Sequence, residues 1–330
     1  MTPVRLAYLG TPEVAVPPLR ALVEAGHDVA LVVTRPDRRR GRGGATSPSP
    51  VKQAAVELGL PVVHDLDALA GAGTGGGNAG TGVELGVVVA YGRLVPAPVL
   101  RRVPMVNLHF SLLPRWRGAA PVERAILAGD QSTGVCVMAV EEGLDTGPVY
   151  AARQVSIGPR EHAGELRGRL VGLGSELLVD VLAGGATHLP EARPQVGEPT
   201  YAAKIGPAEL ELHWERPAAE LARVVRLDRA WTTFRGRRLG VLRAEVVAAP
   251  VDRPSGAAGS PGRPPDPGSL LGDTVVTGDG ALRLLSVHPA GGRPTDAPSW
   301  LRGARPVGGE RLGTPAADPG VAGAAPGPER

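Results

Sequence analysis

The stretch VRLAYLGTPEVAVPPLRALVEAGHDVALVVT, Val4 to Thr34, decides the fold of the first half of the chain. Val4 to Leu9 is a compact apolar run and predicts a strand, and Val29 to Thr34 predicts a second strand. Between them, Thr11 is expected to cap a helix that has Pro12 at its first position. Strand, helix and strand in this order begin a parallel α/β sheet. The first turn lacks the GxGxxG pattern, so a dinucleotide site is disfavoured.

Further elements of both kinds follow and extend this sheet. The pattern predicts strands over Val87–Ala90, Met105–Phe110 and Gly134–Val140, and helices over Val51–Leu58, Gly118–Ala128 and His162–Ala183. The segment from Ala70 to Gly82, between the helix at 51–58 and the strand at 87–90, is nearly all small residues and predicts a flexible surface loop. Together these elements predict an α/β domain over residues 1–189.

The composition changes after this domain. Residues 190–203 are rich in Pro, Gly and charge, which is typical of a linker. Residues 204–314 contain short β-like runs and one helical stretch, and they predict a small β-barrel with an internal helix. The runs are Leu210–Trp214, Trp231–Phe234, Arg238–Val247, Thr274–Thr277 and Leu282–Val287, the helix is Ala218–Arg226, and a Pro/Gly-rich insertion covers Val251–Gly268. Residues 315–330 are expected to be a disordered tail.

The composition excludes several classes of protein. A chain of 330 residues with 42% apolar and 21% charged residues fits about two globular domains. No apolar run approaches the roughly 20 residues of a membrane helix, and we expect no membrane association and no secretory signal. The one cysteine, Cys136, cannot form an internal disulfide, which favours the cytoplasm. The net charge of +3 permits a nucleic-acid partner without establishing one.

The residues best suited to chemistry lie in VNLHFSLLPRWRGAAP, Val106 to Pro121, and in EEGLDTGPV, Glu141 to Val149. Asn107 and His109 are two apart on a predicted strand, so both side chains point the same way. Histidine can relay a proton and asparagine can stabilise an oxyanion during attack by an amine on a carbonyl. Asp145 follows a strand, where a carboxylate could orient the histidine. The alternative is that all three merely bond nearby backbone.

An arginine-rich loop follows the second predicted strand. Five arginines occupy eight positions, a density suited to following a nucleic-acid backbone; they are Arg35, Arg38, Arg39, Arg40 and Arg42. No Cys/His spacing indicates a zinc site, and no metal is expected.

At this point the chain resembles the methionyl-tRNA formyltransferase family, within the wider group of folate-dependent formyltransferases. The resemblance covers residues 4–313, and its carriers are LGTPEVAVPPLRAL, TRPDRRRGRG followed by SPSPVK, VVVAYGRLVP, NLHFSLLPRWRGAAP, TGVCVMAVEEGLDTGPV, TYAAKI and AWTTFRGRRL. It implies a Rossmann-like formyltransferase domain followed by an OB-like C-terminal tRNA-binding domain. It also implies transfer of the formyl group of 10-formyltetrahydrofolate to the α-amino group of methionine on initiator tRNA, in translation initiation. Separately, we expect a monomer that needs no metal.

The resemblance also assigns residues to roles. Asn107, His109 and Asp145 match the family's catalytic triad. The folate-binding segment matches Ser111, Leu112, Leu113 and Pro114, and the arginine loop matches the tRNA-contacting insertion, with contacts from Arg42, Arg40 and Arg38. Two other functions stay open: a folate-dependent formyltransferase for a small amine, and a tRNA-binding relative without catalysis.

The arginine loop generates the first prediction. Replacing Arg42 with alanine should raise the KM for tRNA about 10-fold, because a charge-assisted contact is lost, and should leave folate binding unchanged. Steady-state kinetics with each substrate varied in turn measures both effects. An equal loss for the two substrates would show that the loop does not hold tRNA.

Overall fold

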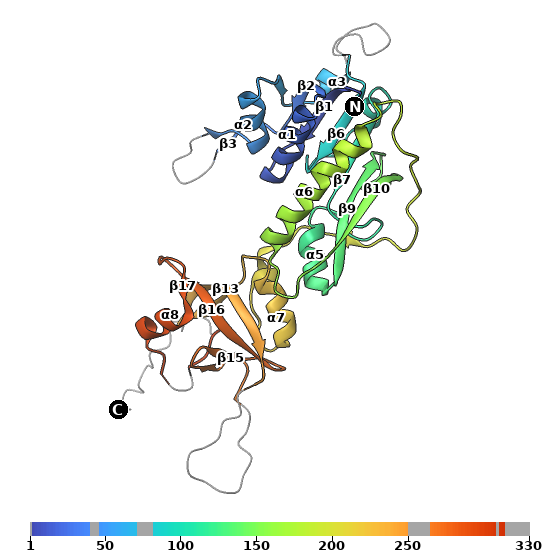
Figure 1. Cartoon of the computed structure of the whole chain (residues 1–330). Helices are drawn as coiled ribbons and strands as arrows, with labels where there is room; N and C mark the ends of the chain where they lie inside the picture. Colours follow the sequence, from blue (N-terminus) through green and yellow to red (C-terminus); the bar gives the residue numbers. More distant parts are fainter. Residues whose placement is uncertain (1, 40–45, 71–81, 250–264, 308–309, 314–330) are drawn as a thin grey trace, which may run out of the picture. The chain divides into compact units, whose positions relative to one another are not determined.

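The computed structural model describes residues 2–39, 46–70, 82–249, 265–307 and 310–313 (Figure 1). The chain divides into two compact units, Met1–Lys204 and Ile205–Arg330. The expected tail over 315–330 lies outside the described residues. So do most of the two predicted loops at 70–82 and 251–268, and so do Arg40 and Arg42.

A seven-stranded sheet forms the centre of the first unit. Its order is β10 (Val149–Ser156), β9 (Ser132–Ala139), β7 (Met105–His109), β6 (Leu85–Val89), β1 (Arg5–Gly10), β2 (Asp28–Val33) and β5 (Val62–Val63). The strands from β7 to β5 pair in parallel, whereas β9 and β10 pair antiparallel at one edge. The central strand β6 is buried along its whole length, as expected for a parallel strand covered on both faces.

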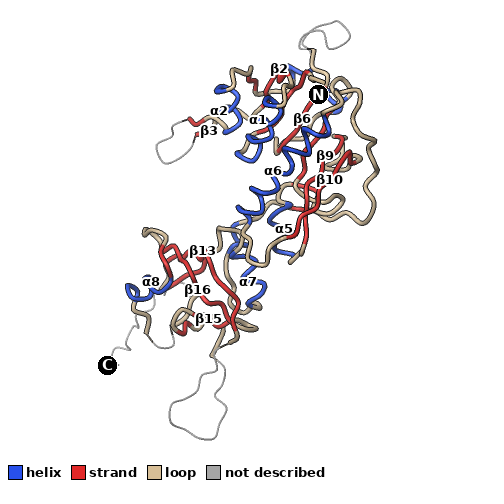
Figure 2. Tube along the Cα trace, viewed as in Figure 1, coloured by secondary structure: helices blue, strands red, loops and turns tan. Residues whose placement is uncertain are grey.

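Helices cover the faces of this sheet, as Figure 2 shows. The helical elements are η1 (Glu13–Ala15), α1 (Val16–Glu24), α2 (Pro50–Glu57), α3 (Asp67–Ala70), α4 (Ala97–Leu100), α5 (Pro121–Ala128) and α6 (Ala163–Leu182). The long helix α6 packs on α1, β9 and β10. Side chains of β1 and β2, among them Ala7, Leu9 and Val33, join Val99 of α4 in a buried cluster. Two short ladders complete the unit: β3 (Arg38–Arg39) with β4 (Thr46–Ser47), and β8 (Arg117–Gly118) with β11 (Tyr201–Ala202).

The expected start of the first helix is wrong. The helix α1 begins at Val16 after the short turn η1, and Thr11 makes no cap. The Thr11 hydroxyl instead donates to the carbonyl oxygen of Tyr91 at 3.4 Å. The prolines at positions 17 and 18 explain the later start, because a residue without an N–H fits best in the first helical turn.

Residues 190–203 have little regular structure, in keeping with their composition, yet they are fixed to the first unit. Arg193 exchanges backbone hydrogen bonds with Val149 at 2.8 and 2.9 Å, and β11 pairs with β8. The same pairing explains why the helix expected from Gly118 begins only at Pro121, since Gly118 belongs to β8.

The second unit is the small antiparallel β domain expected from the sequence. Its sheet has the order β12 (Trp231–Phe234), β13 (Arg237–Val247), β16 (Ala281–Pro289), β15 (Thr274–Val276) and β14 (Leu270–Leu271), with β17 (Thr295–Asp296) beside β16. Its helices are η2 (Pro207–Leu210), α7 (Ala218–Val225) and α8 (Ala297–Ala304). The prediction of a strand over Leu210–Trp214 is wrong. Leu210 is the last residue of η2, and within this segment only Glu211 forms a β-bridge, to Trp231.

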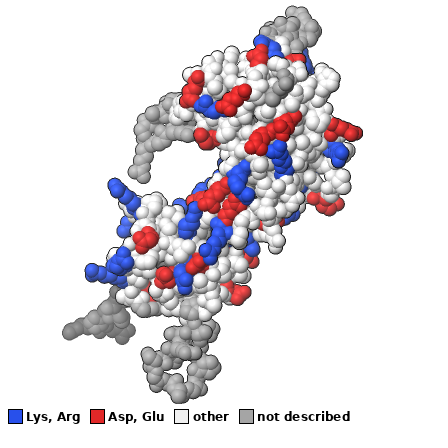
Figure 3. All heavy atoms as spheres, viewed as in Figure 1, with Lys and Arg blue, Asp and Glu red and all other residues white. Residues whose placement is uncertain are grey.

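Figure 3 shows basic and acidic side chains interspersed on one face of the molecule. Of the helices in the described ranges, none combines the length and hydrophobicity that crossing a lipid bilayer requires.

Two glycines of α6 generate a matched prediction. A Cβ on Gly174 would lie 3.1 Å from atoms of Leu108 and Val135, whereas a Cβ on Gly172 would meet nothing within 4 Å. Gly174→Leu should therefore lower the free energy of unfolding by about 1–3 kcal/mol through overpacking. Gly172→Ala should raise it by up to about 1 kcal/mol, because alanine favours a helix over glycine. Urea denaturation measures both, and a destabilised Gly172→Ala variant would contradict the packing described.

Candidate active site

A cavity of about 740 Å³ opens where the parallel strands end. Its walls come from the segments that follow β1, β2, β6 and β7, and from the loop after β9. They include Thr11, Arg35, Ala90–Val95, Asn107–Phe110, Gly118, Glu141 and Gly143–Asp145. The carboxyl ends of parallel strands are where open α/β sheets bind ligands. The volume lies within the roughly 300–1,000 Å³ of small-molecule sites.

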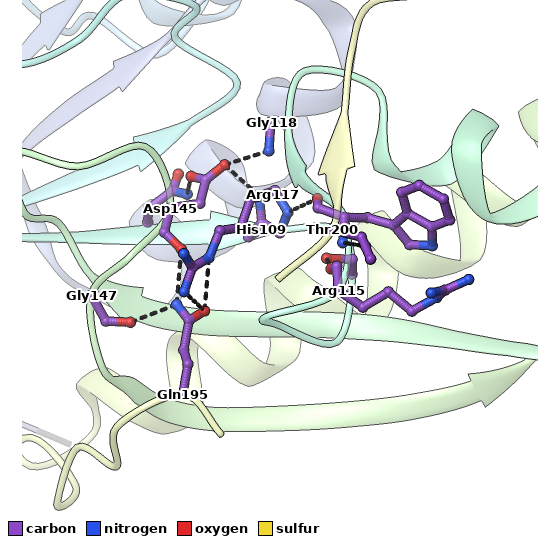
Figure 4. A network of polar contacts seen from close by, with 11 residues as sticks. His109, Arg115, Arg117, Gly118, Asp145, Gly147, Gln195 and Thr200 are labelled. Atoms are coloured by element: carbon purple, nitrogen blue, oxygen red, sulfur yellow. Dashed lines mark hydrogen bonds and ion pairs between the residues drawn. The ribbon is translucent and has the colours of Figure 1, made fainter. Parts of the chain in front are cut away.

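The structure brings Asn107, His109 and Asp145 together in this cavity. Figure 4 shows His109 beside Asp145. Asn107 Nδ2 donates to Asp145 Oδ1 at 3.4 Å, and His109 Nδ1 lies 3.6 Å from Asp145 Oδ2. The same Oδ2 accepts the backbone N–H of Gly118 at 2.7 Å. The side chains of His109 and Asp145 are only 6% and 13% exposed. Their interaction is therefore little screened by water.

The second nitrogen of His109 fixes the position of its proton. His109 Nε2 lies 2.9 Å from the carbonyl oxygen of Trp116, which can only accept, so Nε2 carries the hydrogen. In the neutral ring, Nδ1 then holds the lone pair. This nitrogen is an acceptor in the neutral ring, and the carboxylate of Asp145 lies beside it at 3.6 Å.

Unusual backbone conformations gather at this site. Ala90, Trp116 and Asp145 all have positive φ, of 47°, 65° and 52°. Residues other than glycine rarely adopt this region, and such residues concentrate at functional sites where surrounding contacts hold them. Here the carbonyl of Trp116 is held by His109, and the carboxylate of Asp145 by Gly118.

The cysteine next to the site has an unreactive thiol. Cys136 on β9 lies opposite His109 in the ladder between β7 and β9. Burial raises the pKa of the Cys136 thiol to about 11. The thiol therefore stays protonated near neutral pH and does not act as a nucleophile. No group of three or more His, Cys, Asp or Glu residues that could hold a metal occurs in the part of the chain that the structure describes.

The charge of the cavity wall is mixed with an excess of cations. Arg35, Arg93 and Lys204 line it together with the acids Glu141 and Asp145. The Arg35 guanidinium donates to the carbonyl oxygen of Gly92, which fixes one of these cations at the wall. A positive wall favours ligands that carry carboxylates or phosphates.

Ser111 to Pro114 lie beside the cavity but are absent from its described lining. Ser111 is buried and donates from its hydroxyl to the carbonyl oxygen of Arg115 at 2.6 Å, which closes a turn. Leu112 lines a separate cavity of about 260 Å³ with Trp116 and Thr133. Direct contact of these four residues with folate stays a prediction.

Both arginines around Trp116 have protein partners, which the sequence did not reveal. Arg115 donates to the carboxylate of Asp130 at 2.6 and 2.9 Å, and Asp130 also accepts from Trp116 Nε1 at 2.8 Å. Arg117 donates to Gln195. The loop around the Trp116 carbonyl is thus held by side chains from distant segments.

The described part of the arginine loop is a hairpin stem, where a loop alone was expected. Arg38 pairs with Ser47 and Arg39 with Thr46. Beside the stem, Lys52 Nζ lies 2.8 Å from a carboxylate oxygen of Asp37. Arg38 therefore lies at the base of the loop, while Arg40 and Arg42 are outside the described residues.

Two family models match the chain: "Formyl transferase" over residues 4–182 and "Formyl transferase, C-terminal domain" over residues 204–305. The chain therefore belongs to the formyltransferase family. Within it, similar curated proteins include methionyl-tRNA formyltransferases from several bacteria. That of Dinoroseobacter shibae is 45% identical and the alignment covers 91% of this chain and 97% of the relative. That of Methylococcus capsulatus is 43% identical, with 94% and 100% covered.

Solved structures share the fold at much lower identity. An N-formyltransferase from Helicobacter canadensis in complex with folinic acid and dTDP-3-aminofucose has a TM-score of 0.62 at 14% identity, covering 88% of this chain and 100% of that one. HypX from Aquifex aeolicus in complex with tetrahydrofolic acid has a TM-score of 0.59 at 16% identity, covering 91% of this chain and 47% of that one.

The geometry around Asp145 generates a prediction. Asp145→Asn keeps the size of the side chain but removes the charge that faces His109. We expect formyl transfer to slow about 10²- to 10⁴-fold, the range for loss of general acid–base catalysis, with substrate binding retained. Rapid-quench kinetics and equilibrium binding separate the two effects.

A matched control is Glu142→Gln, which removes an exposed carboxylate three residues away that does not line the cavity. It should keep wild-type turnover. Wild-type turnover in Asp145→Asn itself would assign Asp145 a structural role.

Proposed function

We propose that this protein transfers the formyl group of 10-formyltetrahydrofolate to the α-amino group of methionine carried by initiator tRNA. The observation that carries the proposal is the convergence of Asn107, His109 and Asp145 in one cavity of about 740 Å³. It is supported by identities of 41–45% to methionyl-tRNA formyltransferases over at least 91% of the chain.

The side chains support a direct transfer. The uncharged amine attacks the formyl carbon, which forms the new C–N bond and moves the carbonyl electron pair onto oxygen. Asn107 donates an amide hydrogen to this oxyanion. His109 Nδ1 takes the proton that the amine loses, directly or through a water molecule, and Asp145 stabilises the imidazolium at 3.6 Å. Collapse breaks the bond from carbon to N10 of the folate, which leaves as tetrahydrofolate after receiving a proton from His109.

The substrates fit the wall of the cavity. Exposed Leu94 and Leu144 offer apolar surface at the cavity. Arg35, Arg93 and Lys204 offer cations for the carboxylates of folate or the phosphates at the tRNA end. The stem at Arg38 and the second unit extend the contact to tRNA phosphates, in this proposal. We further propose that the protein acts as a monomer in the cytoplasm.

The direct test is a formylation assay with 10-formyltetrahydrofolate and three acceptors: methionyl initiator tRNA, methionyl elongator tRNA and a nucleotide-linked amino sugar. Formyl-methionyl-tRNA should accumulate with the initiator. Formylation of the sugar alone would replace the proposal with the small-amine alternative. If folded protein formylates none of these acceptors, the proposed formyltransferase activity is wrong.

Salt provides an independent prediction. If tRNA is held mainly through phosphates, kcat/KM for tRNA should fall steeply and linearly on a logarithmic scale between about 50 and 200 mM KCl. The KM for the folate donor should change much less, because few charges are involved. Kinetics at four salt concentrations measure both slopes, and equal slopes would contradict phosphate-dominated tRNA binding.

A further inference from the structure

The segment 193–202 contacts both the loop around Trp116 and the loop at Asp145, and we call it the strap. It falls in the interval between the two family models, which end at residue 182 and resume at residue 204. Both ends of the strap are fixed by backbone pairing: Arg193 pairs with Val149, and β11 pairs with β8. Thr200 adds a side-chain contact, since its Oγ1 accepts the N–H of Trp116 at 2.9 Å.

One side chain of the strap reaches the catalytic loops. The Gln195 amide donates from Nε2 to the carbonyl oxygens of Asp145 and Gly147, both at 2.8 Å. Its Oε1 accepts two hydrogen bonds from Arg117, from Nε at 3.1 Å and from Nη2 at 2.7 Å (Figure 4). All four hydrogen-bonding positions of the amide are filled. The opposite amide orientation would place N–H groups against the guanidinium and oxygen against two carbonyls, so the partners define the orientation.

These contacts act on the two loops that form the triad. Asp145 has a φ of 52°, a conformation that needs support from outside the loop, and Gln195 holds its carbonyl. Arg117 lies in the sequence between Trp116 and Gly118. The carbonyl oxygen of Trp116 accepts from His109, and the N–H of Gly118 donates to Asp145. Gln195 therefore links the segment that hydrogen-bonds His109 to the loop that carries the Asp145 carboxylate.

We propose that Gln195 is a positioning residue for formyl transfer, which holds the Asp145 carboxylate at His109 by tying the 145–147 loop to Arg117. This role rests on the proposed function. It predicts that loss of Gln195 slows the chemical step without weakening substrate binding, because Gln195 does not line the cavity.

The test compares Gln195→Ala and Gln195→Glu in the full-length chain. Glutamate has almost the same shape and keeps the acceptor for Arg117, but its ionised carboxylate cannot donate to the carbonyls of residues 145 and 147. We expect kcat to fall about 10- to 100-fold in both variants, with the KM for each substrate within about 2-fold of wild type. Val196→Ala, at the neighbouring position that is 87% exposed, is the matched control and should keep the wild-type kcat.

A double-mutant cycle separates positioning from general structural support. In the Asp145→Asn background, single-turnover rates should show that Gln195→Ala adds less than about a 2-fold loss, because the group that it positions has lost its charge. The full loss in that background, or a Gln195→Glu variant with wild-type kcat, would overturn the proposal. So would Gln195 variants that all melt well below Val196→Ala, which would assign the residue to stability. Wild-type protein that fails to formylate any acceptor would instead remove the proposed function.

Discussion

Gly118 donates its backbone N–H to Asp145 Oδ2 at 2.7 Å, and this hydrogen bond joins two loops that are 27 residues apart in the sequence. The rest of the site depends on it. With Oδ2 held, the carboxylate faces Nδ1 of His109, while Trp116, two residues before Gly118, accepts from the other nitrogen of the ring. The imidazole is thus held between a carbonyl and a carboxylate that are set by the same short segment.

This arrangement has a conformational cost of about 1–3 kcal/mol for each residue held at positive φ. Trp116 and Asp145 both have such a φ, and each is bonded by groups from other segments. Thr200 accepts from the N–H of Trp116, and Gln195 donates to the carbonyl of Asp145. The energy that holds Trp116 and Asp145 in these conformations therefore comes partly from a segment with almost no regular structure, far along the chain from both loops.

Local sequence patterns predicted the layout of the first unit well. Strand periodicity placed Asn107 and His109 on one face, and a carboxylate after a strand was expected at the same edge, where the structure brings all three together. The order of apolar runs predicted the parallel sheet, because strands that are buried on both faces are uninterrupted runs of apolar residues. The edge strand β10 was missed, since its burial alternates and its apolar signal is weak.

What the sequence could not predict depends on tertiary contacts. The partners of Arg115 and Arg117 lie 15 and 78 residues away, so no spacing rule connects them. The role of Trp116 at the site is carried by its backbone carbonyl, which every residue type has. The start of α1 was misplaced because a threonine followed by proline is a good local cap signal, whereas the pair of prolines five residues later decides where the helix begins.

The cavity, the strap and the side chains of Asn107, His109 and Asp145 all belong to the unit that ends at Lys204. The second unit can therefore change in sequence without altering a residue that lines this cavity. A different acceptor would require a different surface to present it, while the lining of this cavity would stay the same. Such a division would let proteins that share the first unit differ in the acceptor that they bind through the second unit.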